Sequence, residues 1–442
     1  MKRNIIAILL VAFGVAPIMA QGYTLKSCIN NGLENNYSLK IVRNTEQVAS
    51  NNATIANAGY LPQVDLSAGY TATLDNTNST ARATGDVTSE RNVTDQTLRA
   101  GIDLNWTIFD GFNIQAKYSR LQELKRQSKT QTRIVLEDYV ADMASEYYNF
   151  VQQKVRARNL EYAVELSRER MRIEYERYVI GKSSRLDYKQ AQVDFNADLT
   201  KSIKQQESLA SSRIRLKELM GDKDLKSSFD IIDSVIVLYE GEEKFNFDAL
   251  WESTLNHNAS ILKAAQNRTL AELDLKAAAS RDYPYLRLNA GYGYTQNKYE
   301  INPTLKRSNW GADVGVTLGM RLFDGNRSRE RKNARIAVDN AELEQRNLEL
   351  NLYADLCDLW QAYENNLRLL EFERENVKTA RENHEIACAR NLLGNLSGIE
   401  MREAQKSLLD AEERILEAEY DTKICEISLL LISGKILDYL GN

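Results

Sequence analysis

The sequence has few prolines, cysteines and histidines. Its 442 residues include four prolines, four cysteines and two histidines. Because proline interrupts helices, this scarcity favours long, unbroken helices. His257 and His384 each stand alone on a polar helical stretch and are expected to be surface residues. Since no Cys/His cluster has metal spacing and no phosphate loop or Gly-x-Ser-x-Gly elbow occurs, we expect no metal, no cofactor and no enzyme activity.

Strong net charge and long apolar runs are also absent. The formal net charge of −5 gives no case for nucleic acid binding. Residues 1–20 have the parts of a signal peptide, namely Lys2 and Arg3, an apolar core from Ile5 to Val15, and Ala20 before the cut. That core is too short to span ~30 Å of hydrocarbon, and no later run of about 18 apolar residues occurs. We expect an exported protein without a helical anchor.

The chain instead contains an internal duplication. Pro62 recurs as Pro284, and Phe109-Asp110-Gly111 recurs as Phe323-Asp324-Gly325, at offsets of 222 and 214. Gly181 recurs as Gly394 at an offset of 213. Matches in fixed order at nearly constant spacing indicate a repeated unit.

The duplication predicts the organisation of the chain. After the signal peptide we expect a first repeat, an inter-repeat equatorial segment, a second repeat and a C-terminal equatorial tail, over residues 21–221, 222–246, 247–434 and 435–442. Within each repeat the predicted order is helix, strand, strand, long helix, turn, helix, with the helical hairpins turning near Gly181 and Gly394.

Two stretches in each copy alternate apolar and polar residues, as in Ile102, Leu104 and Trp106. The predicted strands are about 63–74, 98–109, 285–295 and 310–323, with a mobile loop at 75–97 and a shorter counterpart at 296–309. A soluble sheet packed on a helix is one interpretation of period-two alternation. Strand lengths of about 9–12 residues, and Tyr and Trp near strand ends, favour strands that cross a membrane.

Four strands cannot close a barrel alone. Open sheet edges are not tolerated in lipid, and the smallest single-chain bacterial barrels have about eight strands. Several chains must therefore contribute, and three would supply twelve strands.

The helices are too long for a globule. Residues 112–180 contain no proline and no glycine, and at ~1.5 Å per residue a continuous helix here would reach ~100 Å. In the second copy, apolar and small residues from Met401 to Ile432 keep a 4-3 spacing that is typical of a coiled-coil seam. The predicted fold class is mainly α with a β-barrel.

These features in this order resemble TolC-family outer-membrane channel proteins. The segment from Tyr178 to Asp187, followed by Ala191-Gln192, is similar to that family's helix-turn tip, and Gly394 to Glu400, followed by Ala404-Gln405, is its partner. The resemblance implies a homotrimer in which a twelve-stranded outer-membrane barrel continues as a periplasmic α-helical barrel. It further implies the passive channel of a tripartite efflux or type I secretion system, docked to a periplasmic adaptor and an inner-membrane pump of the RND or ABC type.

The resemblance also implies site residues. In the family, acidic residues just after the tip glycine ring a narrow periplasmic aperture. The matching positions are Glu400 and Glu403, and Asp187 is the first-copy equivalent of Glu400. The tip turns that would dock the adaptor contain Tyr178 and Gly181 in the first copy and Gly394 in the second. From the residues alone, a solvated acidic helix face remains an equal alternative for the carboxylates.

The contacts that close the tip in the family use Tyr, Arg and Asp. Tyr178 and Asp187 fit that pattern. Asn391 and Leu396 stand where the second copy should have an aromatic and a basic residue, so the match of the closing network stays open.

The main rival is a trimeric coiled-coil adhesive or structural protein. Such adhesins place four strands in one C-terminal block, whereas here two separated pairs lie between helices. A soluble helical scaffold would leave the Tyr- and Trp-bearing strands unexplained. The cargo (drug, metal, peptide or protein) and the particular pump are not encoded in any motif of the chain.

Overall fold

The computed structural model describes residues 22–82, 84–227, 229–238, 245–301, 304–393 and 395–438. The predicted signal peptide and Gly394 lie outside these residues. The chain forms two compact units. The helical unit draws on residues up to Ile41, Ile134–Asn258 and residues from Asn351, and the sheet unit on Val42–Arg133 and Ala259–Leu350. Each unit therefore contains parts of both sequence copies.

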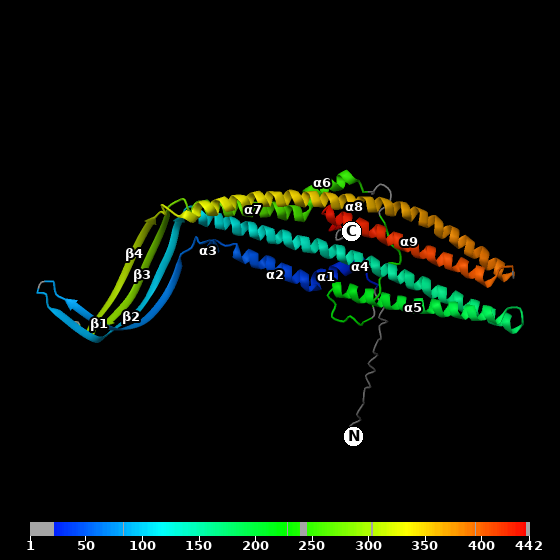
Figure 1. Ribbon diagram of the computed structural model, residues 1–442, viewed down its shortest axis with the longest axis horizontal. Helices are drawn as coiled ribbons and strands as arrows, with labels where there is room; N and C mark the ends of the chain where they lie inside the picture. The colour runs from blue at the N-terminus through cyan, green and yellow to red at the C-terminus, as the bar shows by residue number, and fades with distance from the viewer. Residues whose placement is uncertain are drawn as a thin grey trace, which may run out of the picture. The chain divides into compact units, whose positions relative to one another are not determined.

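The duplicated unit predicted from the sequence is confirmed by the order of elements (Figure 1). The first copy consists of α1 (Leu25–Asn35), α2 (Tyr37–Asn52), α3 (Ile55–Ala58), β1 (Gln63–Thr80), β2 (Val87–Asp110), α4 (Asn113–Val179) and α5 (Arg185–Leu219). The second copy consists of α6 (Phe247–His257), α7 (Ala259–Ser280), β3 (Tyr285–Lys298), β4 (Lys306–Gly319), α8 (Gly325–Leu392) and α9 (Gly398–Ile432). Among the described residues, no helix has both the length and the hydropathy needed to cross a membrane.

The sheet unit contains one antiparallel sheet in the order β1-β2-β3-β4. Ile102 of β2 lies opposite Leu66 of β1 and Tyr292 of β3, so the apolar alternation is in phase across the sheet. The apolar side chains on the two edge strands are exposed, Leu66 by 83% and Val314 by 75%. An apolar face in this state does not fit a soluble sheet packed on a helix.

The first hairpin is longer than the sequence pattern indicated. Residues 75–97 were predicted to be a loop, but β1 continues to Thr80 and β2 begins at Val87, with an irregularity between Asp75 and Thr77. The Thr-, Asn- and Ser-rich segments have no apolar face for an alternation to reveal. Threonine nevertheless favours strands, and the ladder needs only backbone groups. The loop predicted at 296–309 is shortened for the same reason, since β3 runs to Lys298 and β4 starts at Lys306.

The predicted fourth strand, 310–323, ends early. Gly319 is the last residue of β4 and lies opposite Tyr285, which is the first residue of β3. Among the described residues, no strand therefore pairs with residues 320–323. The equivalent end of β2 reaches Asp110, because there Phe109 and Asp110 pair with Leu286 and Tyr285.

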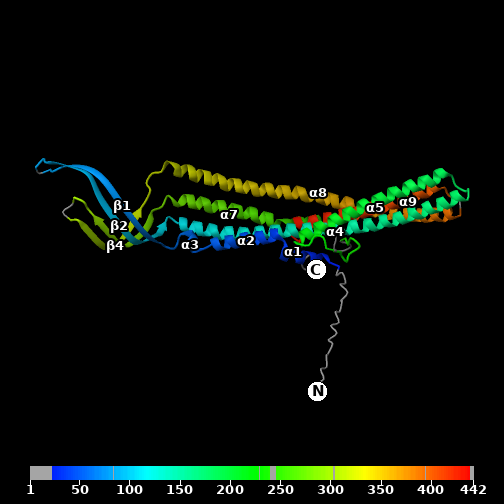
Figure 2. The same ribbon diagram turned by 90° about the horizontal axis from the view of Figure 1, so that it is seen from below.

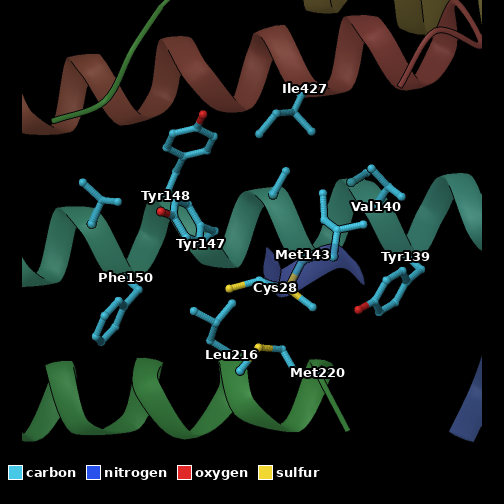
Figure 3. Close-up of a cluster of buried hydrophobic side chains, with 14 of the residues drawn as sticks. Cys28, Tyr139, Val140, Met143, Tyr147, Tyr148, Phe150, Leu216, Met220 and Ile427 are labelled. Atoms are coloured by element: carbon cyan, nitrogen blue, oxygen red, sulfur yellow. The ribbon is translucent and has the colours of Figure 1, made fainter. Parts of the chain in front are cut away.

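The helical unit is held by a core around the middle of α4 (Figure 3). Met143, Tyr147 and Phe150 of α4 are fully buried against Cys28 of α1 and Leu216 of α5. Ile427 of α9 and residues of the inter-repeat segment, Phe229, Ile231 and Ile236, complete the cluster. At ~1.5–3 kcal/mol for each large apolar side chain, this burial is the main stabilising term of the unit.

The helices of this unit form two hairpins, α4 with α5 and α8 with α9 (Figures 1 and 2). The 4-3 seam predicted on α9 is confirmed at most of its positions, since these members are buried: Ala404, Leu408, Ala411, Ala418, Thr422, Cys425 and Leu429. Met401, Ile415 and Ile432, which were also predicted to lie on the seam, are half-buried. The prediction for His384 was wrong. It lies on α8 with 7% of its surface exposed, and its Nε2 is 3.6 Å from Cys388 Sγ one turn further on.

Candidate functional site

The tips of the two helical hairpins carry the residues singled out by the sequence. Between α4 and α5, Gly181 has φ +74°, a left-handed conformation that glycine adopts without strain. The amides of Lys182 and Ser183 donate to the Arg177 carbonyl at 2.8 and 3.2 Å, which closes the end of α4. Gly181 therefore makes the tip turn possible.

Asp187 and Glu400 occupy equivalent positions, because each completes a capping box at the start of a helix. The Asp187 carboxylate accepts hydrogen bonds from the amide and hydroxyl of Ser184, at 3.2 and 2.7 Å, and the Ser184 hydroxyl accepts from the Asp187 amide. The Glu400 carboxylate accepts from the amide and hydroxyl of Ser397, at 2.9 and 2.8 Å. Carboxylates here also complement the helix dipole.

These contacts keep both groups charged. Hydrogen bonds from Ser184 lower the pKa of Asp187, the side-chain bond first. The backbone hydrogen bond from Ser397 is the main cause that lowers the pKa of Glu400. Both carboxylates are exposed and ionised at neutral pH, and capping gives each a structural reason to be acidic.

A cleft of about 550 Å³ lies between the two tips, within the helical unit. Asp187 and Gln190 line it from the first hairpin, and Ile399 and Glu403 from the second. Of the predicted acidic residues, the structure thus brings Asp187 and Glu403 to one cleft, while Glu400 is not part of its lining. Tyr178 is also outside the lining and stacks on Tyr188 of its own hairpin, with ring centroids 6.3 Å apart.

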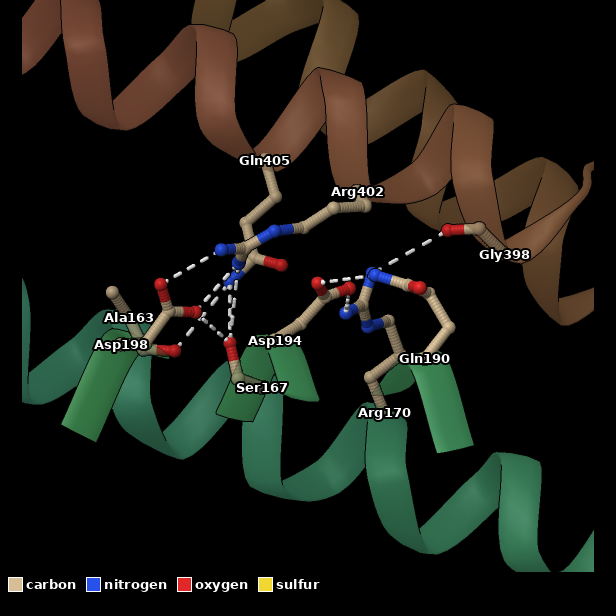
Figure 4. A network of polar contacts seen from close by, with 9 residues as sticks. All are labelled: Ala163, Ser167, Arg170, Gln190, Asp194, Asp198, Gly398, Arg402 and Gln405. Carbon is tan, nitrogen blue, oxygen red and sulfur yellow. Dashed lines mark hydrogen bonds and ion pairs between the residues drawn. The ribbon is translucent and has the colours of Figure 1, made fainter. Parts of the chain in front are cut away.

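The strongest polar contact between the two hairpins was not predicted from the sequence. Arg402 of α9 donates two hydrogen bonds to Asp198 of α5, at 2.6 and 2.7 Å (Figure 4). The Ser167 hydroxyl of α4 also donates to Asp198, and Gln405 Nε2 donates to the Ala163 carbonyl at 3.4 Å. Gln405 follows Ala404 on the seam, and a glutamine beside a seam position was the only sequence signal for this network.

Burial and hydrogen bonding shift the pKa of Asp198 in opposite directions. Burial works to raise its pKa, but the hydrogen bonds from Arg402 and Ser167 outweigh it, so that the pKa is lowered. The hydrogen bond to Asp198 is the first cause that raises the pKa of Arg402. The pair is therefore ionised over the whole physiological range.

A second group of contacts lies nearer the tips. Arg170 of α4 pairs with Asp194 and donates to the Gly398 carbonyl at 3.4 Å, at the start of α9. Arg177 donates to the side chain and the carbonyl of Asn391 on α8, at 3.4 and 3.2 Å. Asn391 thus accepts hydrogen bonds from a basic residue of the first hairpin. Arginines of both hairpins therefore hold the two tips together. Among the described residues, no cluster of three or more metal-ligating side chains occurs.

The sequence profile described as "Outer membrane efflux protein" matches residues 28–222 and 250–435. The chain is 23% identical over 447 residues to outer membrane protein TolC of Vibrio cholerae, with 99% of this chain and 96% of the relative covered. It is 20% identical to outer membrane efflux protein BepC of Brucella suis, with 95% and 87% covered.

Solved structures share the fold. The CmeC outer membrane channel of Campylobacter jejuni superposes with a TM-score of 0.79 at 17% identity, over 93% of this chain and 85% of that one. The outer membrane protein VceC of Vibrio cholerae gives a TM-score of 0.74 at 16% identity, over 93% and 96%.

Proposed function

The chain belongs to the outer membrane efflux protein family, and from this premise we propose that it works as a homotrimeric duct across the outer membrane and the periplasm. Members of this family act as outer-membrane efflux channels, and the protein is located in the outer membrane. What we propose beyond this is that three chains assemble, that their strands close a barrel, and that the duct binds partner proteins.

One observation carries the proposal: a four-stranded sheet with two unpaired edges and an exposed apolar face. Lipid supports such a face but not unpaired edges, because nothing in hydrocarbon can bond to the free backbone groups. A barrel closed with copies of the same chain would keep the apolar face in lipid and pair the backbone groups of both edges. Three copies supply twelve strands, which is within the range of bacterial barrels.

The helical unit would form the periplasmic part of the duct, and its tips would meet the rest of the pump. We propose that the two tip turns, with Tyr178 and Gly181 in the first hairpin and Gly394 in the second, dock a periplasmic adaptor. The adaptor would join the duct to an inner-membrane pump of the RND or ABC type. The duct itself is passive, and no enzymatic step resides in this chain.

The acidic residues at the tips would form a cation-attracting constriction. Asp187 and Glu403 line the cleft between the tips, and the pKa of Asp187 and of Glu400 is lowered by the capping hydrogen bonds. In a homotrimer each of these carboxylates occurs three times around one axis, and charged rings of this kind select ions in pores. The alternative is that Asp187 and Glu400 serve only as helix caps.

The test is the mass of the detergent-extracted protein together with single-channel conductance of the same preparation in a planar bilayer. A trimer with small, cation-selective openings is the expected result. A monomer that stays in solution without detergent would overturn the barrel and the transport function with it.

A further inference from the structure

His384 and Cys388 form a nitrogen–sulfur pair on the buried face of α8. Ala380, one turn before His384, packs against Leu408 and Ala411 of α9, so this face of α8 points toward its hairpin partner. Only 7% of the His384 surface is exposed, and its Nε2 lies 3.6 Å from Cys388 Sγ. The imidazole is therefore held between the two helices with one nitrogen aimed at the sulfur.

The pair is particular to this turn of the chain. Residues four apart on a helix are neighbours, and of the two histidines only His384 has a cysteine at that spacing. His257 has the hydroxyl of Ser253 there instead, at 3.5 Å. Cys357, the other half-buried cysteine of α8, has no histidine within one turn on either side. The chain thus contains a matched histidine and a matched cysteine that lack the pairing.

The separation of the two atoms fits a tetrahedral metal ion. Zinc binds a thiolate sulfur at ~2.3 Å and an imidazole nitrogen at ~2.0–2.1 Å, and at the tetrahedral angle these bonds place the two ligand atoms ~3.5–3.6 Å apart. The separation in the structure is 3.6 Å. A linear ion with the same bond lengths would need ~4.3 Å or more. The pair therefore has the spacing for zinc without a change of rotamer.

A hydrogen bond joins the thiol and the imidazole in the structure. Burial raises the pKa of the Cys388 thiol, and the charge of Glu385 raises it further, so the sulfur keeps its proton at neutral pH and can donate it to His384 Nε2. A zinc ion that enters takes the place of this proton. The proton passes to solvent, the sulfur binds as a thiolate, and the imidazole stays neutral.

We propose that Cys388 Sγ and His384 Nε2 are the two fixed ligands of a zinc site on α8. The site is separate from the proposed duct and does not depend on it. It also corrects the expectation that no cysteine and histidine in this chain have metal spacing, because His-x-x-x-Cys places both ligands on one face of a helix.

The remaining corners of the site are open. Among the described residues, no third metal-ligating side chain is in place beside the pair, whereas a closed structural zinc site has four ligands. Burial has the largest effect on His384 and lowers its pKa, while the charges of Glu385 and Glu412 oppose it. Both carboxylates are therefore near enough to attract a cation.

Glu412 now contacts Arg381 at 3.4 Å in a partly exposed ion pair. Water or one of the two carboxylates would complete the coordination. A site with two fixed ligands binds zinc weakly and releases it readily, so it fills only when the free zinc concentration rises.

Equilibrium dialysis of the full chain in detergent against buffered zinc tests the site, with no histidine tag on the chain. The parent should take up one zinc ion per chain. Cys388→Ser and His384→Gln should each weaken binding at least about tenfold, since loss of even an outer-shell partner of a metal has an effect of that size. Cys357→Ser and His257→Gln are the matched controls and should bind zinc as the parent does.

Two results would overturn the site. One is the absence of zinc uptake by the parent at about 1 mM free zinc, the weak limit of specific binding. The other is equal uptake by the parent, Cys388→Ser and His384→Gln, which would assign the zinc to scattered surface carboxylates. In either case the pair serves only to give the buried imidazole a hydrogen-bond partner.

X-ray absorption at the zinc edge needs no substitution on the packed face of α8, so it remains decisive if His384→Gln folds poorly. Zinc bound to the Cys357→Ser chain should show one sulfur neighbour at ~2.3 Å and nitrogen or oxygen neighbours at ~2.0–2.1 Å. A first shell of nitrogen and oxygen without sulfur would contradict the proposed ligands.

Discussion

Arg402 and Asp198 are joined by two hydrogen bonds of 2.6 and 2.7 Å between helices of different repeats, and only 4% of the Asp198 side chain is exposed. A planar guanidinium that binds a carboxylate through two parallel bonds is the strongest form of ion pair in proteins. Because the partners come from α9 and α5, this pair fixes one hairpin against the other close to the tips.

Asp198→Asn should destabilise the helical unit by about 3 kcal/mol, because it removes the carboxylate that is hydrogen-bonded to the largely desolvated Arg402 guanidinium. Chemical unfolding followed by circular dichroism measures the change. Glu165→Gln removes one partner of an exposed pair with Arg168 and should cost less than about 1 kcal/mol. Equal losses of stability in the two variants would show that the buried pair stabilises the unit no more than the exposed pair does.

Glu400→Gln with Glu403→Gln should lower the preference of the open channel for cations. Glutamine keeps the capping box at the start of α9, so the charge is removed without loss of the cap. The reversal potential across a salt gradient reports the selectivity. Glu165→Gln, which is outside the lining of the cleft between the tips, should leave the selectivity unaltered. A double variant that is as selective as the parent would exclude the acidic ring.

Ser397→Ala should destabilise the first turn of α9 by about 1 kcal/mol, since the cap for the Glu400 amide is lost. Ser184→Ala should do the same for α5. Hydrogen exchange of the capped turns measures both effects. Ser208→Ala is the matched control, because that hydroxyl bonds only to a carbonyl in its own helix; a similar loss of protection around Ser208 would contradict the assignment to capping.

The buried His384 should make the stability of the helical unit depend on pH. Burial lowers its pKa below the ordinary 6.5, while Glu385 and Glu412 oppose the shift. The unfolded chain therefore binds the proton more readily, and stability falls as pH drops below about 6.5, until the folded-state pKa is passed. His384→Gln should remove this dependence between pH 7 and 5 in thermal unfolding scans. The same slope in the variant would assign it to other groups.

The sequence predicted the parts of the fold that repeat with a short period. Alternation identified the faces of Ile102 and Leu104, and the 4-3 spacing identified Leu408 and Leu429, because each period records which side chains are buried. The alternation did not reveal the part of β1 from Asp75 to Thr80, because both faces of the strand are polar there. The Arg402–Asp198 pair joins residues 204 positions apart, and no local pattern contains such a contact. Gln405 hinted at a polar network only because it follows a seam position.

The joint between β2 and β3 has a consequence for the origin of the chain. A half-length ancestor with one copy would carry the same two edges as the present protein, so twice as many identical subunits could close the same ring. Fusion of two such genes would join neighbouring copies in one polypeptide and allow the two halves to differ. The tips do differ, since Glu403 in the second half corresponds to Gln190 in the first.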